Sequence, residues 1–118
     1  MRSDTDLVWK ALAHPTRRAI LDFLAQAPHT TGEVCARFAH PRRGGIGRTG
    51  VMKHIDVLLT ANLVIVRREG RRRWNYLNPV PIQRVCDRWV SRHVRDLARS
   101  ANRLKQLVES GRPSYRDG

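Results

Sequence analysis

Cysteine, aromatic residues, acidic residues and long apolar runs are all scarce in this sequence of 118 residues. Its two cysteines, Cys35 and Cys86, are too few for a disulfide-stabilised scaffold, so we expect free thiols. No apolar run approaches the roughly 20 residues that a membrane-spanning helix needs. Residues 1–6 also lack the apolar core of a secretory signal. We therefore expect a protein without a membrane partner that works in the cytoplasm.

Acidic residues are outnumbered by basic ones. The chain has 23 lysine and arginine residues against 10 aspartate and glutamate residues, which gives a net charge of +13 and a pI near 11.5. A net charge this positive favours an anionic polymer as the binding partner. A chain of this length forms one moderate core, and a small basic domain often gains further apolar burial from a second subunit.

Motifs for catalysis and for metal or cofactor binding are also missing. The sequence has no pair of close carboxylates and no nucleophile motif, and the glycine-rich residues 44–47 lack the lysine and the preceding strand of a phosphate-binding loop. A stable zinc site needs about four ligands. His14, His29 and His40 are instead scattered near turns. We therefore expect no enzymatic activity, no metal site and no cofactor.

One stretch has the pattern of a β-hairpin. Residues 63–66 are a β-branched apolar run, Glu69-Gly70 supplies a turn, and residues 74–77 resume a strand. Five arginines surround the turn: Arg67, Arg68, Arg71, Arg72 and Arg73. Protection of a sheet edge, the alternative explanation, needs only one or two charges. Five arginines favour contact with a phosphate backbone.

Elsewhere the apolar residues repeat with the period of a helix. This period predicts helices over residues 6–13, 16–27, 31–39, 48–61 and about 80–109. Pro15 suits the first turn of the second helix, and Thr30 with Glu33 has the spacing of a capping box for the third. We expect a domain over residues 1–110 and a flexible tail over 111–118. The fold class is mainly α with a β-hairpin.

The two short helices before the hairpin predict a winged helix-turn-helix. The second helix of such a pair lies in the major groove of DNA, which is about 12 Å wide. The candidate DNA contacts in its first turns are Arg48, Thr49, Met52, Lys53 and His54. Arg48 or Lys53 suits guanine, whereas Met52 offers only apolar contact. His54 has two open interpretations, a phosphate contact or a packed, hydrogen-bonded side chain.

Four segments between Val8 and Val108 carry motifs of a known family. They are Trp9-Lys-Ala-Leu-Ala-His-Pro-Thr-Arg-Arg-Ala-Ile-Leu, Thr31-Gly-Glu-Val, Val51-Met-Lys-His-Ile with Leu58-Leu59 and Ala61-Asn-Leu-Val, and Arg68-Glu-Gly-Arg-Arg-Arg-Trp-Asn-Tyr-Leu. Together they resemble the ArsR/SmtB family of winged helix-turn-helix repressors. The resemblance implies a symmetric dimer, formed mainly by the first and last helices, that binds an imperfect inverted repeat in a promoter and blocks transcription.

The apolar stripe of the final helix is too long for one small core. We expect a second subunit to cover it, with interface residues Leu7, Val85, Trp89, Leu97, Leu104 and Leu107.

The sequence departs from the family pattern between Phe38 and Arg48. The turn there is enlarged, and its Arg42 and Arg43 either follow a phosphate or lie in a solvated loop. Gly47 replaces the usual hydroxyl cap of the next helix and Gly50 lies inside it. We therefore expect a recognition helix that is only marginally ordered without DNA.

Metal-sensing members of the family carry paired cysteines where this chain has Cys35 and Arg37. One thiol beside an arginine is a poor soft-metal site, so the sequence resembles the branch without recognised metal sites. A redox switch at Cys35 or Cys86 is an alternative, because a nearby arginine favours the reactive thiolate. The sequence identifies no inducer.

The leading hypothesis is a sequence-specific transcriptional regulator that represses as a homodimer on double-stranded DNA. The alternative is a basic nucleic-acid-coating or RNA-associated protein with little sequence preference.

Overall fold

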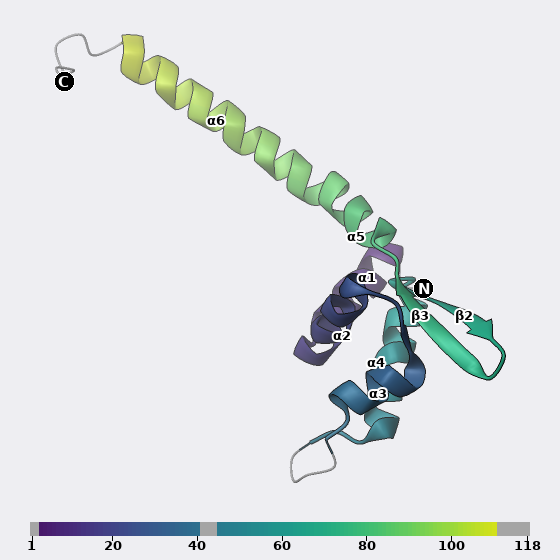
Figure 1. The fold of residues 1–118 in the computed structure, drawn as a ribbon. Helices are drawn as coiled ribbons and strands as arrows, with labels where there is room; N and C mark the ends of the chain where they lie inside the picture. Colours follow the sequence, from purple (N-terminus) through teal and green to yellow (C-terminus); the bar gives the residue numbers. More distant parts are fainter. Residues whose placement is uncertain (1–2, 41–44, 111–118) are drawn as a thin grey trace. The chain divides into compact units, whose positions relative to one another are not determined.

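The computed structural model describes residues 3–40 and 45–110, and the chain divides into two compact units, Met1–Gln83 and Arg84–Gly118. The elements in chain order are α1 (Asp4–Leu12), α2 (Pro15–Gln26), β1 (His29–Thr30), α3 (Thr31–Phe38), α4 (Arg48–Thr60), β2 (Val64–Glu69), β3 (Arg72–Leu77), α5 (Val80–Val85), a π-helical turn (Cys86–Val90) and α6 (Ser91–Ser110) (Figure 1). The expected fold class, mainly α with a β-hairpin and the order of a winged helix-turn-helix, is confirmed.

Capping residues set the starts of the first helices. The Ser3 hydroxyl accepts a hydrogen bond from the backbone N–H of Asp6, so α1 begins two residues before the predicted start at residue 6. Asp4 and Asp6 lie in its first turn, where the helix dipole favours negative charge. Pro15 occupies the first position of α2, as predicted.

The capping box of α3 is confirmed. The Thr30 hydroxyl accepts a bond from the backbone N–H of Glu33 at 3.1 Å, and the Glu33 carboxylate accepts one from the Thr30 N–H at 2.8 Å. The second bond stabilises the charged carboxylate and lowers the pKa of Glu33. The helix ends at Phe38, one residue earlier than predicted, because Ala39 is its C-cap.

The core lies where the helical periodicity placed it. Its cluster of buried residues comprises Ala11, Ile20, Leu21, Leu24, Val34, Cys35, Val51, Ile55, Leu58, Ala61, Leu63 and Val64. These residues come from α1, α2, α3, α4 and the start of the hairpin. The core therefore fixes α3 and α4, the predicted helix-turn-helix pair, against the base of the hairpin.

The sheet has three antiparallel strands in the order β1-β3-β2. The predicted hairpin is confirmed, with Val64 opposite Leu77 and Glu69 opposite Arg72. Gly70 has φ +62°, which is the reason for a glycine at the first position of this two-residue turn. The two-residue strand β1 was not predicted, because it exists only through pairing with β3, more than 40 positions away in the chain.

Residues 80–110 are helical throughout, as predicted for about 80–109, but the sequence did not reveal that the α-helical geometry is interrupted. The π-helical turn Cys86–Val90 separates α5 from α6. The five residues contain no proline or glycine to signal the change, and the apolar period alone does not distinguish a π turn from an α turn. All side chains of residues 92–110 are exposed.

Across the described ranges, no helix combines the length and apolar character that crossing a membrane requires.

Candidate nucleic-acid interface

The first turns of α4 present polar side chains to solvent. Arg48, Thr49 and Lys53 are exposed, and Gly47 at the N-cap makes no side-chain cap bond. Met52 differs from the expectation, since it is half-buried and packs against the core cluster. The surface available for base contacts therefore consists of the two cations and the threonine.

Gly50 has a packing role that the sequence did not reveal. A Cβ at this position would lie 3.2 Å from the Cβ of Ile46, so glycine leaves room for the Ile46 side chain beside α4. The backbone N–H of His40 donates to the carbonyl of Ile46 at 2.7 Å and joins the two ends of the enlarged loop. Arg42 and Arg43, the two predicted phosphate contacts, lie outside the described residues.

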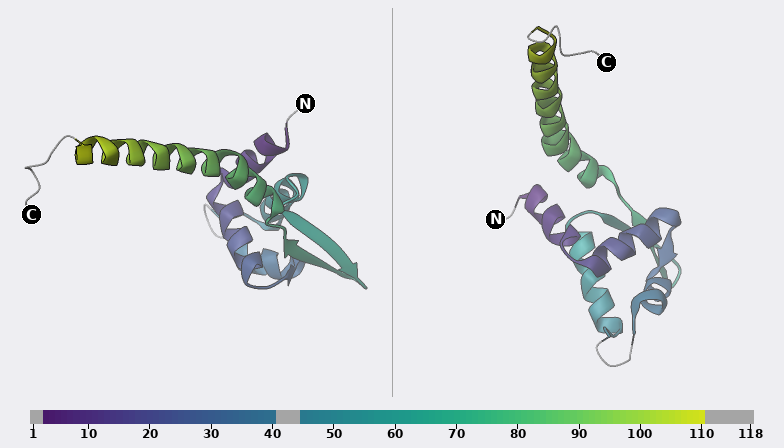
Figure 2. Two further views of the ribbon diagram at one scale, coloured as in Figure 1. Left: turned by 90° about the horizontal axis from the view of Figure 1, so that it is seen from above. Right: turned by 90° about the vertical axis from the view of Figure 1, so that its left-hand side faces the viewer.

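The hairpin carries its arginines on both faces. Arg67 lies opposite Trp74 and Arg68 lies opposite Arg73, so successive pairs point to opposite sides. Four of the five predicted residues are exposed, while Arg73 is half-buried and its Nε has no hydrogen-bond partner within the described part of the chain. Within the first unit the turn of the hairpin projects away from helices α2, α3 and α4 (Figures 1 and 2). The projecting end is therefore strongly cationic on either side.

The aromatic residues of the hairpin do not form an open stacking surface. Trp74 and Tyr76 are both half-buried, and they lie opposite Arg67 and Ile65 on the paired strand. Proteins that bind single strands without sequence preference expose aromatic rings for base stacking. This face of the hairpin therefore lacks the exposed rings that base stacking requires.

Asn75 anchors the hairpin to the start of α3. Its side chain is 1% exposed, and Nδ2 donates to the carbonyl of His29 at 3.2 Å and to the hydroxyl of Thr31 at 3.1 Å. Strand alternation puts residue 75 on the face opposite Trp74 and Tyr76, but it does not indicate that a polar residue there joins two distant elements.

The two arginines of the Pro-Thr-Arg-Arg motif hold the end of α1. Arg17 donates from Nε to the carbonyl of Ala11 at 2.9 Å and from Nη2 to that of Lys10 at 2.8 Å. Arg18 donates from Nη1 to the carbonyl of Leu12 at 2.6 Å. The last carbonyls of a helix lack intrahelical partners. The motif therefore joins the C-terminal end of α1 to the first turn of α2.

Arg17 also contacts α4. Its Nη1 lies 3.2 Å from Nδ1 of His54, and the imidazole rings of His54 and His14 are 4.4 Å apart between centroids. Nδ1 of His14 accepts the backbone N–H of Thr16 as the N-cap of α2. Burial, followed by the charges of His14 and Arg17, lowers the pKa of His54. Of the two interpretations of His54, the structure favours the packed, hydrogen-bonded one.

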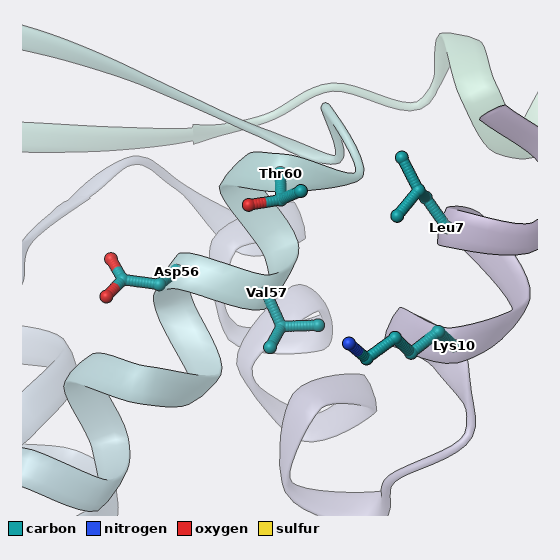
Figure 3. Close-up of a pocket in the computed structure, with 5 residues that line it drawn as sticks. All are labelled: Leu7, Lys10, Asp56, Val57 and Thr60. Atoms are coloured by element: carbon teal, nitrogen blue, oxygen red, sulfur yellow. The ribbon is translucent and has the colours of Figure 1, made fainter. Parts of the chain in front are cut away.

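A shallow pocket of about 140 Å³ lies between α1 and α4. Figure 3 shows Leu7 and Lys10 of α1 on one side, with Val57 between the helices and the Asp56 carboxylate pointing away from Lys10. Thr60 completes the lining. Pockets for small ligands usually measure a few hundred cubic ångströms or more, so this indentation gives little support to an inducer site.

The apolar residues of α6 repeat at alternating intervals of three and four. This α6 seam consists of Val94, Leu97, Ala101, Leu104 and Val108, in the spacing of a coiled-coil heptad. Leu97, Leu104 and Leu107 are 69%, 62% and 67% exposed. Val94, at 56% exposed, belongs to the seam but was missing from the predicted interface. The spacing of residues 94, 97, 101 and 104 in the sequence identifies Val94 as a member of the seam.

The remaining predicted interface and thiol residues differ in exposure. Trp89 is 41% exposed, Leu7 is half-buried and Val85 is buried within its own chain. Cys35 is a buried core residue, Cys86 is half-buried, and both are free. In the part of the chain that the structure describes, no three His, Cys, Asp or Glu side chains gather as a metal site would require.

The sequence is similar to curated regulators. The family described as a helix-turn-helix domain matches residues 12–67. The HTH-type transcriptional regulator Rv2034 of Mycobacterium tuberculosis is 42% identical over 74 residues, which are 63% of this chain and 64% of that protein, just under two thirds of its length. The uncharacterized HTH-type transcriptional regulator YuzN of Bacillus subtilis is 33% identical over 91 residues, 76% of this chain and 99% of that protein. The transcriptional repressor SdpR of Bacillus subtilis is 30% identical over 76 residues, 64% of this chain and 78% of that protein.

The fold is similar to solved structures of the same kind. The crystal structure of an ArsR family transcriptional regulator aligns with a TM-score of 0.69 and 26% identity over 81% of this chain and 98% of the other. The homodimeric winged helix-turn-helix DNA-binding domain of Mb0332 from Mycobacterium bovis aligns with a TM-score of 0.57 and 27% identity over 79% of each chain.

Proposed function

Because this chain belongs to the ArsR family of winged helix-turn-helix transcriptional regulators, we propose that it represses transcription as a homodimer bound to an inverted-repeat operator. The main support for this proposal is that Arg48, Thr49 and Lys53 are exposed in the first turns of α4. The name of SdpR as a repressor and the homodimeric state of the Mb0332 domain support the proposal. The regulator acts in the cytoplasm by binding DNA and not by catalysis.

In this mechanism α4 reads bases from the major groove. The guanidinium of Arg48 and the ammonium of Lys53 donate to guanine O6 and N7, and the Thr49 hydroxyl donates or accepts at a neighbouring base edge. Met52, half-buried against the core, fixes the helix more than it contacts DNA. His54 is left out of the base-reading set because it is engaged with Arg17.

The hairpin contributes phosphate contacts beside this helix. Arg67, Arg68, Arg71 and Arg72 are exposed around the turn, where guanidinium groups donate to phosphate oxygens of the flanking groove. These contacts increase affinity for every duplex and carry no sequence information.

The α6 seam supplies the dimer contact. Two copies pair through it and through α1, and an inverted repeat with half-sites about one turn of DNA apart, roughly 34–36 Å, suits the two recognition helices of such a dimer. Leu97 and Leu104, both largely exposed in the single chain, are the central residues of this contact.

Binding to the DNA upstream of its own gene, compared with a random duplex of equal length across a salt series, tests the proposal. We expect affinity at least about 10³-fold above that for random DNA. Equal affinities for upstream, random and library-selected duplexes, with a steep salt dependence, would instead favour the alternative of a nucleic-acid coat. A parallel series with reductant tests the redox hypothesis for Cys35 and Cys86.

A further inference from the structure

We propose that Arg17, His54 and His14 form a positioning cluster that holds α4 for DNA binding only while both imidazoles are neutral, so that acidification releases DNA. The cluster joins three elements, because Arg17 bonds the end of α1, His14 caps α2 and His54 lies on α4. The inference rests on the proposed function, since it takes α4 as the helix that reads DNA.

The hydrogen bonds assign the protons of both rings. An arginine guanidinium only donates, so Nδ1 of His54 accepts from Arg17 and carries no proton. The backbone N–H of Thr16 also only donates, so Nδ1 of His14 is likewise unprotonated. Each neutral ring therefore has its proton on Nε2. A second proton would go to Nδ1 and remove the bond there.

In the part of the chain that the structure describes, the charges that shift the pKa of His54 are cationic, and no carboxylate is among them. The charges that act on His54 are those of His14 and Arg17, both from the start of α2. The end of α1 faces Arg17 with the backbone carbonyls of Lys10 and Ala11. Within the described residues α3 and β2 pack against α4 without adding a charged group that acts on His54. Protonation would thus place like charges within a few ångströms of each other.

Loss of these bonds weakens the positioning of the DNA-binding residues. His54 follows Lys53 directly on α4, and Arg17 bonds both His54 and the end of α1. The charge introduced by protonation separates His54 from Arg17 and His14, so α4 keeps its core packing but loses the polar contacts that orient the turn of Lys53 against the first two helices. The direction is diagnostic, because protonation elsewhere on the protein adds positive charge and strengthens binding to a polyanion.

The test uses the full chain and a duplex selected from a random library by the wild-type protein at about pH 7.5. Affinity is measured between about pH 7.5 and about pH 5.5 at constant ionic strength, and we expect it to fall at least about tenfold. The double substitution His14→Asn and His54→Asn keeps an oxygen acceptor close to each Nδ1 and cannot titrate. We expect its affinity to stay constant or rise over the same range.

His40→Asn is the matched control, because His40 is exposed and lies outside the cluster. It should retain the wild-type loss of affinity. Arg17→Lys keeps the charge but loses the planar fork, so it should weaken binding at the higher pH and flatten the pH profile. Wild type and double variant with the same profile would overturn the proposal.

A second measurement needs no DNA and separates this inference from the proposed function. Nitrogen NMR of the free protein reports which ring nitrogen carries the proton, and we expect Nε2 for both His14 and His54. A proton on Nδ1 of either ring would overturn the cluster even if DNA binding is specific. If both tautomers are as expected but no duplex can be selected, the proposed function is contradicted. The inference then fails with it, because there is no bound DNA to release.

Discussion

The arginines of this chain have different roles, and the contacts of each side chain show which role it has. Arg17 and Arg18 bond the carbonyls of α1, so the positive charge of this motif serves the fold. Arg48 and Arg72 have exposed side chains on α4 and on the hairpin, where a ligand can reach them. Composition predicts an anionic partner, but only the contacts show which cations remain available to it.

Substitutions of these exposed cations should separate base reading from phosphate binding. We expect Arg48→Ala or Lys53→Ala to cost about 1–3 kcal/mol on the preferred duplex and to relax sequence preference. Arg72→Ala should weaken binding to all duplexes alike and reduce the salt slope by about one. Competition binding with specific and random DNA measures both quantities. The same loss on both duplexes for all three variants would contradict this division.

The stability of the fold should also depend on His54. Its pKa is lowered by burial and by His14 and Arg17, so the unfolded chain takes up the proton at a higher pH than the folded one. The contribution is complete above the ordinary histidine pKa of about 6.5 and is lost as the pH falls below it. Urea unfolding should show a smaller decline for His54→Asn than for wild type below that pH. Parallel declines would show that other groups control acid stability.

At the scale of single elements, local signals predicted more than long-range ones. The capping box of α3, the start of α2 and the turn at Gly70 depend on residues within four positions of one another, and each is confirmed. Strand β1 and the bond from Arg17 to His54 depend on partners far along the chain. No single-sequence pattern contains such pairings, so the exposed cations of the candidate site were predictable and its supporting contacts were not.

The N-cap of α4 offers a test of local stability. Gly47 has extended backbone angles, no cap bond, and open space around a Cβ. We expect Gly47→Ser to accept a backbone N–H of the first turn and to be about 1 kcal/mol more stable than Gly47→Ala, with wild type between them. Thermal and urea unfolding compare the three proteins. A serine variant no more stable than the alanine variant would show that this helix start needs no cap.

Asn75 tests the anchoring of the hairpin. Asn75→Ala removes both bonds that join β3 to His29 and Thr31, and we expect a loss of about 1–3 kcal/mol in the free energy of unfolding. Asn102→Ala, at an exposed position of α6, is the control and should change stability by less than about 0.5 kcal/mol. Equal stabilities of the two variants would assign Asn75 no anchoring role.

For the whole molecule, charge and apolar surface point to two different partners. The net charge of +13 favours DNA, and the exposed α6 seam favours a second copy of the chain. Composition and size predicted both partners. The spacing of the seam, which includes Val94, is present in the sequence, and the structure adds that these side chains are exposed along α6.

Leu104→Asp should separate the subunits. It places a carboxylate in the centre of the α6 seam, and we expect the dimer dissociation constant to rise at least about tenfold, since a buried leucine contributes roughly 1.5–3 kcal/mol. Gln106→Asp adds the same charge to the same helix outside the seam and should leave the dimer intact. Sedimentation equilibrium measures both. Dissociation by neither variant would place the interface elsewhere.

The order of the two units along the chain has a consequence for biosynthesis. Residues of the first unit are translated before α6, and that unit contains its own core and both proposed DNA-contacting elements. Domains generally fold as units during synthesis. We therefore expect the first unit of each new chain to fold on its own core, and pairing through α6 to depend on the concentration of finished protein. Occupancy of a two-fold operator would then rise more steeply than in proportion to the protein concentration. A gene controlled by such an operator would respond only above a threshold concentration of the regulator.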